Sequence, residues 1–229
     1  VTASMGNLIA SETKERAYEV YKRVDFINYW LYTFTATCLL CLVEPFVAIW
    51  LGQAFVLTKA ILILAVAIYY FKGINSGIDI AKNAAGLYYP DRFIPMAEAI
   101  ANMVISIVLA KRYGIAGVLF GTLVSFLALS FWAKPYFVCR DVFEVSFARY
   151  AVREGREIVV SVLVAAGTWY AVSLVSLENV LLSFGVKALL ALALSNGLLL
   201  LVYFKTSEFQ YLRGLLESAA NRIGKRKKA

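Results

Sequence analysis

The sequence predicts an all-α fold, a polytopic transmembrane helix bundle of about six spans, from its composition and the pattern of its apolar residues. Of the 229 residues, 61% are hydrophobic and 17% are charged, and the mean hydropathy is +0.72. Soluble domains carry about 45–50% apolar and about 25% charged residues. The apolar residues form long runs without the alternation of a membrane barrel, and a helix satisfies its own backbone hydrogen bonds in lipid.

Six apolar runs are long enough to cross a bilayer. They are Ile27–Leu51, Ala54–Phe71, Phe93–Ala110, Ile115–Ala133, Ile158–Val175 and Val180–Phe204. At 1.5 Å per residue the shorter runs reach about 27 Å, close to the hydrocarbon thickness of about 30 Å. The end of the second run is the least defined, because its helix can continue through Lys72 toward Lys82 across two glycines.

Lysine and arginine fall almost entirely on one side of these runs. Nineteen of the 23 lie before the first run, between the second and third, between the fourth and fifth, or after the sixth. The other side holds Lys59, Lys111 and Arg112, while Lys187 lies inside the sixth run. Because short cytoplasmic loops are enriched in basic residues, we expect a multi-pass protein of the inner (plasma) membrane with both termini cytoplasmic.

Three cytoplasmic segments have apolar residues at helical spacing and predict interfacial helices that anchor on the anionic leaflet. These residues are Ala17, Val20, Tyr21 and Val24, then Phe143, Phe147 and Tyr150, and finally Phe209, Leu212, Leu216 and Ile223. The chain therefore divides into a cytoplasmic interfacial segment (1–26), a six-helix transmembrane region (27–204) and a basic cytoplasmic tail (205–229).

The composition argues against several classes of function. The chain has no histidine, which removes His-based acid–base catalysis and the commonest metal ligand. Cys38 and Cys41 form a C-x-x-C inside the first run without a second pair, so we assign them to helix packing. The net charge of +8 lies in membrane-flanking segments and does not indicate nucleic-acid binding. No catalytic residue, metal or cofactor is predicted.

Three stretches carry a resemblance to a known family. They are SMGNLIASETKERAYEVYKRVDFINYW (4–30), PFVAIWLG (45–52) and PDRFIPMAEAIANMVISIVLAKRYGIAGVLFGTLVSFL (90–127). Together they resemble the bacterial polysaccharide flippases of the multidrug/oligosaccharidyl-lipid/polysaccharide exporter superfamily. This resemblance implies the last six of about fourteen helices, with the N-terminal lobe missing from a chain that begins at Val1. It also implies a transporter rather than an enzyme.

The resemblance further implies a cargo and a mechanism. Such flippases carry a polyprenyl-diphosphate-linked oligosaccharide from the inner to the outer leaflet by alternating access between two lobes. The partners implied are this lipid-linked oligosaccharide, membrane lipids and the missing lobe. Three alternatives stay open: multidrug efflux within the same superfamily, a membrane enzyme such as a polysaccharide polymerase or glycosyltransferase, and a non-transporting fragment.

Two groups of polar residues inside the runs are candidates for substrate binding or coupling. Glu98, Asn102 and Ser106 step by four and form one polar stripe on the third run. The alternative for Glu98 is simple solvation near the cytoplasmic interface. Lys187 lies about two turns inside the sixth run, where it either faces a polar cavity or extends its ammonium group toward the interface.

Other features have structural interpretations. Gly117, Gly121 and Ser125 place small side chains on one face of the fourth run, which favours close helix packing. Glu44 precedes Pro45 beside an aromatic cluster, and we interpret it as an interfacial carboxylate that reaches water. Asp79 and Arg92 are expected to form a solvated pair in the loop between the second and third spans.

Overall fold

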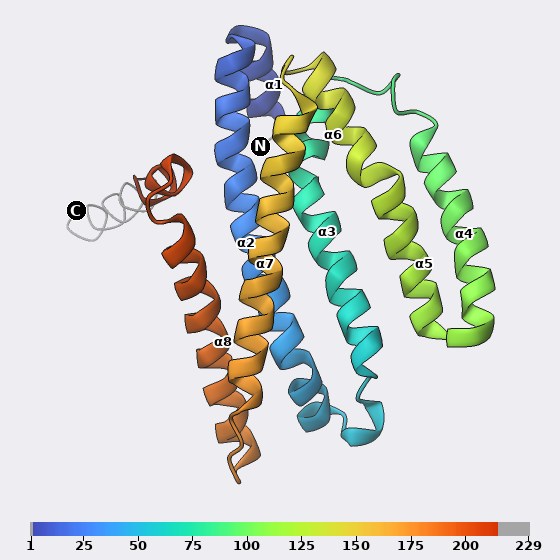
Figure 1. Cartoon of the computed structure of the whole chain (residues 1–229), viewed down its shortest axis with the longest axis vertical. Coiled ribbons are helices and arrows are strands. Elements are labelled where there is room, and N and C mark those ends of the chain that lie inside the picture. Colours follow the sequence, from blue (N-terminus) through green and yellow to red (C-terminus); the bar gives the residue numbers. More distant parts are fainter. Residues whose placement is uncertain (1, 215–229) are drawn as a thin grey trace, which may run out of the picture.

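A computed structural model describes residues 2–214, and within them the protein is all-α without a strand (Figure 1). The helices are α1 (Thr2–Ser11), α2 (Lys14–Trp50), α3 (Lys59–Ala84), α4 (Ile94–Tyr113), α5 (Ile115–Ala128), α6 (Ser130–Asp141), α7 (Phe147–Ser173) and α8 (Val180–Tyr203), with a short 3-10 turn, η1 (Gln53–Phe55), between α2 and α3. The predicted fold class, an all-α bundle, is confirmed.

Six helical segments of the described chain are long and apolar enough to cross a membrane. They are α2, α3, α4, the combined α5–α6 segment (Ile115–Asp141), α7 and α8. The chain is therefore a multi-pass membrane protein. We call the end of the bundle that holds α1, the start of α2 and the α6–α7 connection the basic end, and the end that holds the α2–α3, α4–α5 and α7–α8 connections the opposite end (Figure 1).

The first span begins earlier than hydrophobicity alone indicates. α2 begins at Lys14, and the Thr13 side chain caps it by accepting a hydrogen bond from the Arg16 backbone N–H at 3.3 Å. No glycine or proline interrupts the chain between Lys14 and Glu44, so the apolar positions 17–24 belong to the first span and not to a separate interfacial helix. The helix continues through Pro45 to Trp50.

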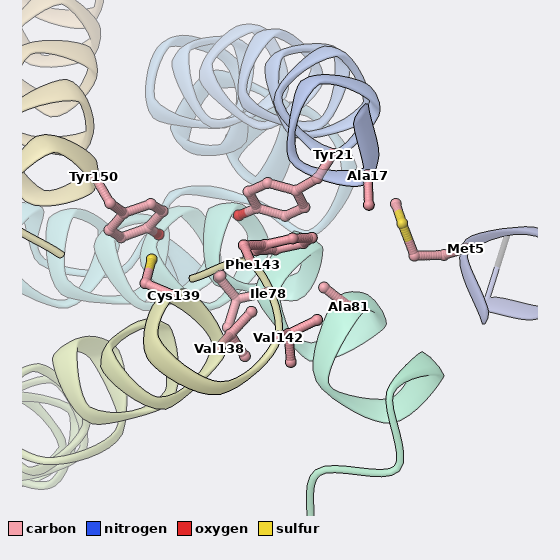
Figure 2. Close-up of a cluster of buried hydrophobic side chains, with 10 residues drawn as sticks. All are labelled: Met5, Ala17, Tyr21, Ile78, Ala81, Val138, Cys139, Val142, Phe143 and Tyr150. Carbon is pink, nitrogen blue, oxygen red and sulfur yellow. The ribbon is translucent and has the colours of Figure 1, made fainter. Parts of the chain in front are cut away.

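Residues at the basic end that were expected at the lipid interface instead form a protein core. Tyr21 is 1% exposed, Phe143 and Tyr150 are each 2% exposed, and the Tyr21 and Phe143 ring centroids lie 5.1 Å apart. Figure 2 shows this cluster, which joins α1, α2, α3, α6 and α7. The interfacial interpretation of these three residues is therefore wrong. Of the third predicted segment, Leu216 and Ile223 lie outside the described residues.

The second span, α3, begins at Lys59 instead of Ala54 and runs on to Ala84, as its less defined end allowed. Its two glycines permit close approach to α2. A Cβ atom at Gly73 would lie 2.0 Å from the Tyr32 ring, and one at Gly77 would lie 2.6 Å from Asp25 Oδ1. The backbone of α3 therefore lies directly against side chains of α2.

The fourth span is divided into α5 and α6 at Leu129. Pro135 inside α6 has no N–H, so the carbonyl of Phe131 lacks its helical donor. Asn75 of α3 supplies a replacement, because its Nδ2 donates to the Phe131 carbonyl at 3.2 Å. Asn75 is 2% exposed and Phe131 is also 2% exposed, so this hydrogen bond is shielded from solvent.

The helices are not equally surrounded. α2 contacts α3, α7 and α8, whereas α4 contacts mainly α5, and Figure 1 shows the α4–α5 pair leaning away from α7 and α8. The predicted small-residue face lies in this contact. A Cβ at Gly117 would meet the Leu109 carbonyl at 2.4 Å, and one at Gly121 would meet Ser106 Oγ at 2.5 Å. The packing interpretation of these glycines is confirmed.

Candidate functional site

The predicted polar stripe on α4 faces α5 and α6. Ser106 Oγ donates to Asn102 Oδ1 at 2.8 Å, and Thr122 Oγ1 of α5 donates to the same atom at 3.3 Å. The Ser130 hydroxyl at the start of α6 donates to Glu98. All three predicted residues are half-buried and lie on one helix face, as their spacing indicates. Their polar atoms hydrogen-bond across the helix–helix contact.

Lys187 faces a polar pocket near the opposite end of the bundle. The pocket has a volume of about 320 Å³ and is lined by Glu44, Gln53, Lys59, Trp169 and Lys187, among others. We call it the lysine pocket. Lys59 Nζ lies 5.9 Å from the Trp169 ring centroid. Of the two alternatives for Lys187, the structure favours the one that faces a polar cavity, and Glu44 lines the same pocket.

A buried group of charged residues was not predicted. Asp25 of α2 and Glu154 and Glu157 of α7 are 5%, 4% and 5% exposed, and one carboxylate oxygen of each lies within 4.8 Å of the others. The Arg153 guanidinium contacts Asp25, and its Nε lies 3.8 Å from Glu157 Oε1. We call these four residues the carboxylate cluster. Buried charges are costly unless they are paired, so this cluster needs a chemical explanation.

The sequence does carry a signal for this cluster. On α2, Asp25 begins a series of polar side chains with a step of four that continues through Tyr29, Thr33 and Thr37. On α7, Glu154 and Glu157 lie on the same helix face as Ser161 and Thr168. Arg149, Arg153 and Arg156 fall between the fourth and fifth apolar runs of the sequence. In the structure they lie on the first turns of α7.

A buried hydroxyl network lies one turn farther into the bundle. Ser161 Oγ lies 2.7 Å from Thr33 Oγ1, and the Tyr70 hydroxyl donates to Ser161 Oγ at 2.8 Å. The Tyr203 hydroxyl of α8 donates to the Tyr29 hydroxyl at 3.3 Å. Polar side chains therefore extend from the carboxylate cluster toward the middle of the α2–α7 contact.

No protein-family model, curated protein or solved structure matches this chain. Its function is therefore inferred from its own residues and their geometry.

The remaining predicted pair, Asp79 and Arg92, does not form. Asp79 lies within α3 because that helix continues past the predicted loop, and it accepts an ion pair from Lys134 of α6 at 2.9 Å. The Arg92 guanidinium lies 4.4 Å from the Tyr89 ring centroid and 4.5 Å from that of Phe93. These two charges therefore support separate local contacts.

The arrangement provides three kinds of polar chemistry among apolar helices. The α4 stripe offers amide, hydroxyl and carboxylate groups for hydrogen bonding. The lysine pocket offers two ammonium groups beside one carboxylate, which suits an anionic group. The carboxylate cluster offers an excess of buried acid. Ionisable residues within membrane-spanning helices are expensive and mark ligand or ion pathways.

Proposed function

We propose that this chain is the C-terminal part of a transporter that moves polyprenyl-diphosphate-linked oligosaccharide units between leaflets for cell-surface polysaccharide assembly. The transporter would lie in the bacterial inner membrane, with the basic end of the bundle and both chain termini on the cytoplasmic side. The remaining helices, upstream of this chain, would complete the second lobe that alternating access requires.

The observation that carries this proposal is the lysine pocket. Lys59 and Lys187 approach it from α3 and α8, two helices long and apolar enough to span a membrane. Two ammonium groups beside the single carboxylate of Glu44 attract an anionic group such as a diphosphate or an acidic sugar. A flat cationic drug would require the opposite charge balance, so polysaccharide transport is preferred over multidrug efflux. The short connections between the described helices also support transport over a catalytic membrane domain.

The shape of the bundle supports a missing partner lobe. The outer face of α4 is apolar and exposed, with Met96, Met103 and Val108 between 58% and 62% exposed. Because α4 contacts mainly α5, this face is free to meet lipid or the upstream helices.

The test uses a complete transporter that contains this segment. Lys187→Gln removes one charge from the pocket, and a loss of about 1 kcal/mol of attraction corresponds to about fivefold slower export. Inner-leaflet lipid-linked precursor should accumulate at unchanged protein abundance, and Lys187→Arg should be milder. Lys111→Gln, at an exposed position at the end of α4, is the matched control. Normal export by Lys187→Gln would remove the support for the proposed cargo site.

A further inference from the structure

The carboxylate cluster contains more acid than its single arginine can neutralise. Asp25, Glu154 and Glu157 are all at most 5% exposed, and the Arg153 guanidinium contacts Asp25 and Glu157. Three ionised carboxylates with one guanidinium would leave a buried double negative charge. A low-polarity environment strongly disfavours that state, so the cluster must take up positive charge.

We propose that Glu154 and Glu157 share a bound proton, and that with Asp25 and Arg153 they form a proton-binding site at the basic end of the α2–α7 contact. The site is defined by the chain's own residues and does not depend on the cargo of the proposed transporter. Arg153 is in direct contact with Asp25, so that carboxylate is already compensated. Two further carboxylates held close together in a buried site retain one proton between them.

A second observation points to the same place. The Tyr21 hydroxyl is fully buried, has no hydrogen bond of standard geometry among the described residues, and lies close enough to Asp25 to act as its donor. Figure 2 shows it directed toward Tyr150, which precedes Glu154 by one helical turn. The α3 backbone covers Asp25 at Gly77, because a Cβ there would lie 2.6 Å from Asp25 Oδ1. The cluster therefore has the Tyr21 hydroxyl as a nearby donor and is covered by the backbone of α3.

Titratable groups from every neighbouring element face this site. Besides the four members of the cluster, they are Tyr18, Tyr21 and Tyr29 of α2, Tyr70 of α3, Cys139 of α6, Arg149, Tyr150 and Arg156 of α7, Tyr203 at the end of α8, and Glu208, which follows α8. Arg149 and Arg156 add positive charge from outside the cluster. Arg153 remains the guanidinium in contact with the buried acids.

The ligand set favours a proton over a metal ion. Calcium takes about six to eight oxygen ligands and magnesium requires a near-octahedral set. The geometry brings together one oxygen from each of the three carboxylates, and with the Tyr21 phenol this makes four. A metal ion at the centre of the three acids would also lie beside the Arg153 guanidinium, which repels it. A proton needs only two nearby acceptor oxygens.

The hydroxyl network gives the proton a neighbouring relay. Ser161 follows Glu157 by one helical turn, and Thr33 and Tyr70 both lie within hydrogen-bonding distance of Ser161 Oγ. Each hydroxyl both donates and accepts, so these three groups form a hydrogen-bonded set one turn beyond Glu157. The site therefore lies at one end of a polar route into the bundle.

The test is infrared spectroscopy of the purified 229-residue chain in lipid nanodiscs. The carbonyl stretch of a protonated carboxylic acid is recorded in steps from about pH 6 to pH 9, where ordinary aspartates and glutamates are ionised. The wild-type chain should show roughly one protonated carboxyl that is lost as the pH rises. Glu154→Gln and Glu157→Gln should each abolish the whole signal, because the remaining glutamate then has no neighbouring glutamate with which to share a proton.

Two further variants sharpen the outcome. Glu178→Gln, at an exposed position before α8, is the matched control and should leave the signal unchanged. Asp25→Asn frees Arg153 to compensate the glutamates, so the wild-type signal should shift to lower pH. Because glutamine has the shape of a neutral glutamic acid, both Gln variants should retain their helical circular dichroism.

Three results would overturn the proposal. The first is a wild-type chain with no protonated carboxyl above about pH 6, which requires no variant to fold. The second is a signal that survives both Gln substitutions. The third is a signal that moves when sodium replaces choline or when calcium is added at fixed pH, because such a site takes a metal ion. None of these measurements involves the cargo. A result that refutes the proton-binding site would therefore leave the transport proposal untouched.

Discussion

Replacing Asn75 by alanine should destabilise the bundle, because it leaves a backbone carbonyl of α6 without a hydrogen-bond donor. The change removes the Nδ2 donor that lies 3.2 Å from the Phe131 carbonyl, and Pro135 cannot supply a helical N–H in its place. A buried acceptor left unpaired costs about 1–3 kcal/mol. Asn75 Oδ1 is itself buried without a hydrogen-bond partner among the described residues, so its removal offsets part of that cost. We expect a net loss of about 1 kcal/mol.

A double-mutant cycle isolates this interaction. Pro135→Ala restores the N–H that donates to the Phe131 carbonyl, so Asn75→Ala should cost much less in the Pro135→Ala background. The expected coupling free energy is about 1 kcal/mol, measured by reversible unfolding in mixed micelles. Coupling smaller than about 0.3–0.5 kcal/mol, the usual error of additivity, would refute the account of why Asn75 is buried beside α6.

Two further predictions concern the transporter and its orientation. In a complete transporter, Glu98→Gln should lower export at normal protein abundance, because it weakens the hydrogen bond from Ser130 and removes the charge. Val108→Ala, at a position 62% exposed, is the control. Normal export by Glu98→Gln would leave Glu98 as a helix-contact residue only. Reporter fusions at Gly86 should read cytoplasmic and those at Gly114 external, and the reverse result would invert the proposed topology.

The helices were predictable because their signals are local. Each apolar run contains its own length and periodicity, and the six spans correspond to the six runs. The ends were harder to place, because a helix does not stop where hydrophobicity stops. Lys14 to Phe26 continues α2 without an apolar majority. The break at Leu129 has no glycine or proline beside it, because the nearest proline, Pro135, lies six residues farther along the chain.

The site was only partly predictable because its contacts depend on distant residues. The step of four places Glu98, Asn102 and Ser106 on one face, but the identity of the facing helix is not contained in that spacing. Asp25 and Arg153 are separated by 128 residues and meet only through the packing of α2 on α7. Their local neighbours gave the polar pattern of each helix but not the pairing between the helices.

The contact between Gly73 and Tyr32 governs how the first two spans can move. Because a methyl group at Gly73 would overlap the Tyr32 ring, the α3 backbone lies in direct contact with that ring, and α3 cannot approach α2 more closely there without displacing it. A second close approach, between Gly77 and Asp25, lies one turn farther along α3, so the two helices fit closely over successive turns. Any relative motion within the bundle should therefore carry α2 and α3 together.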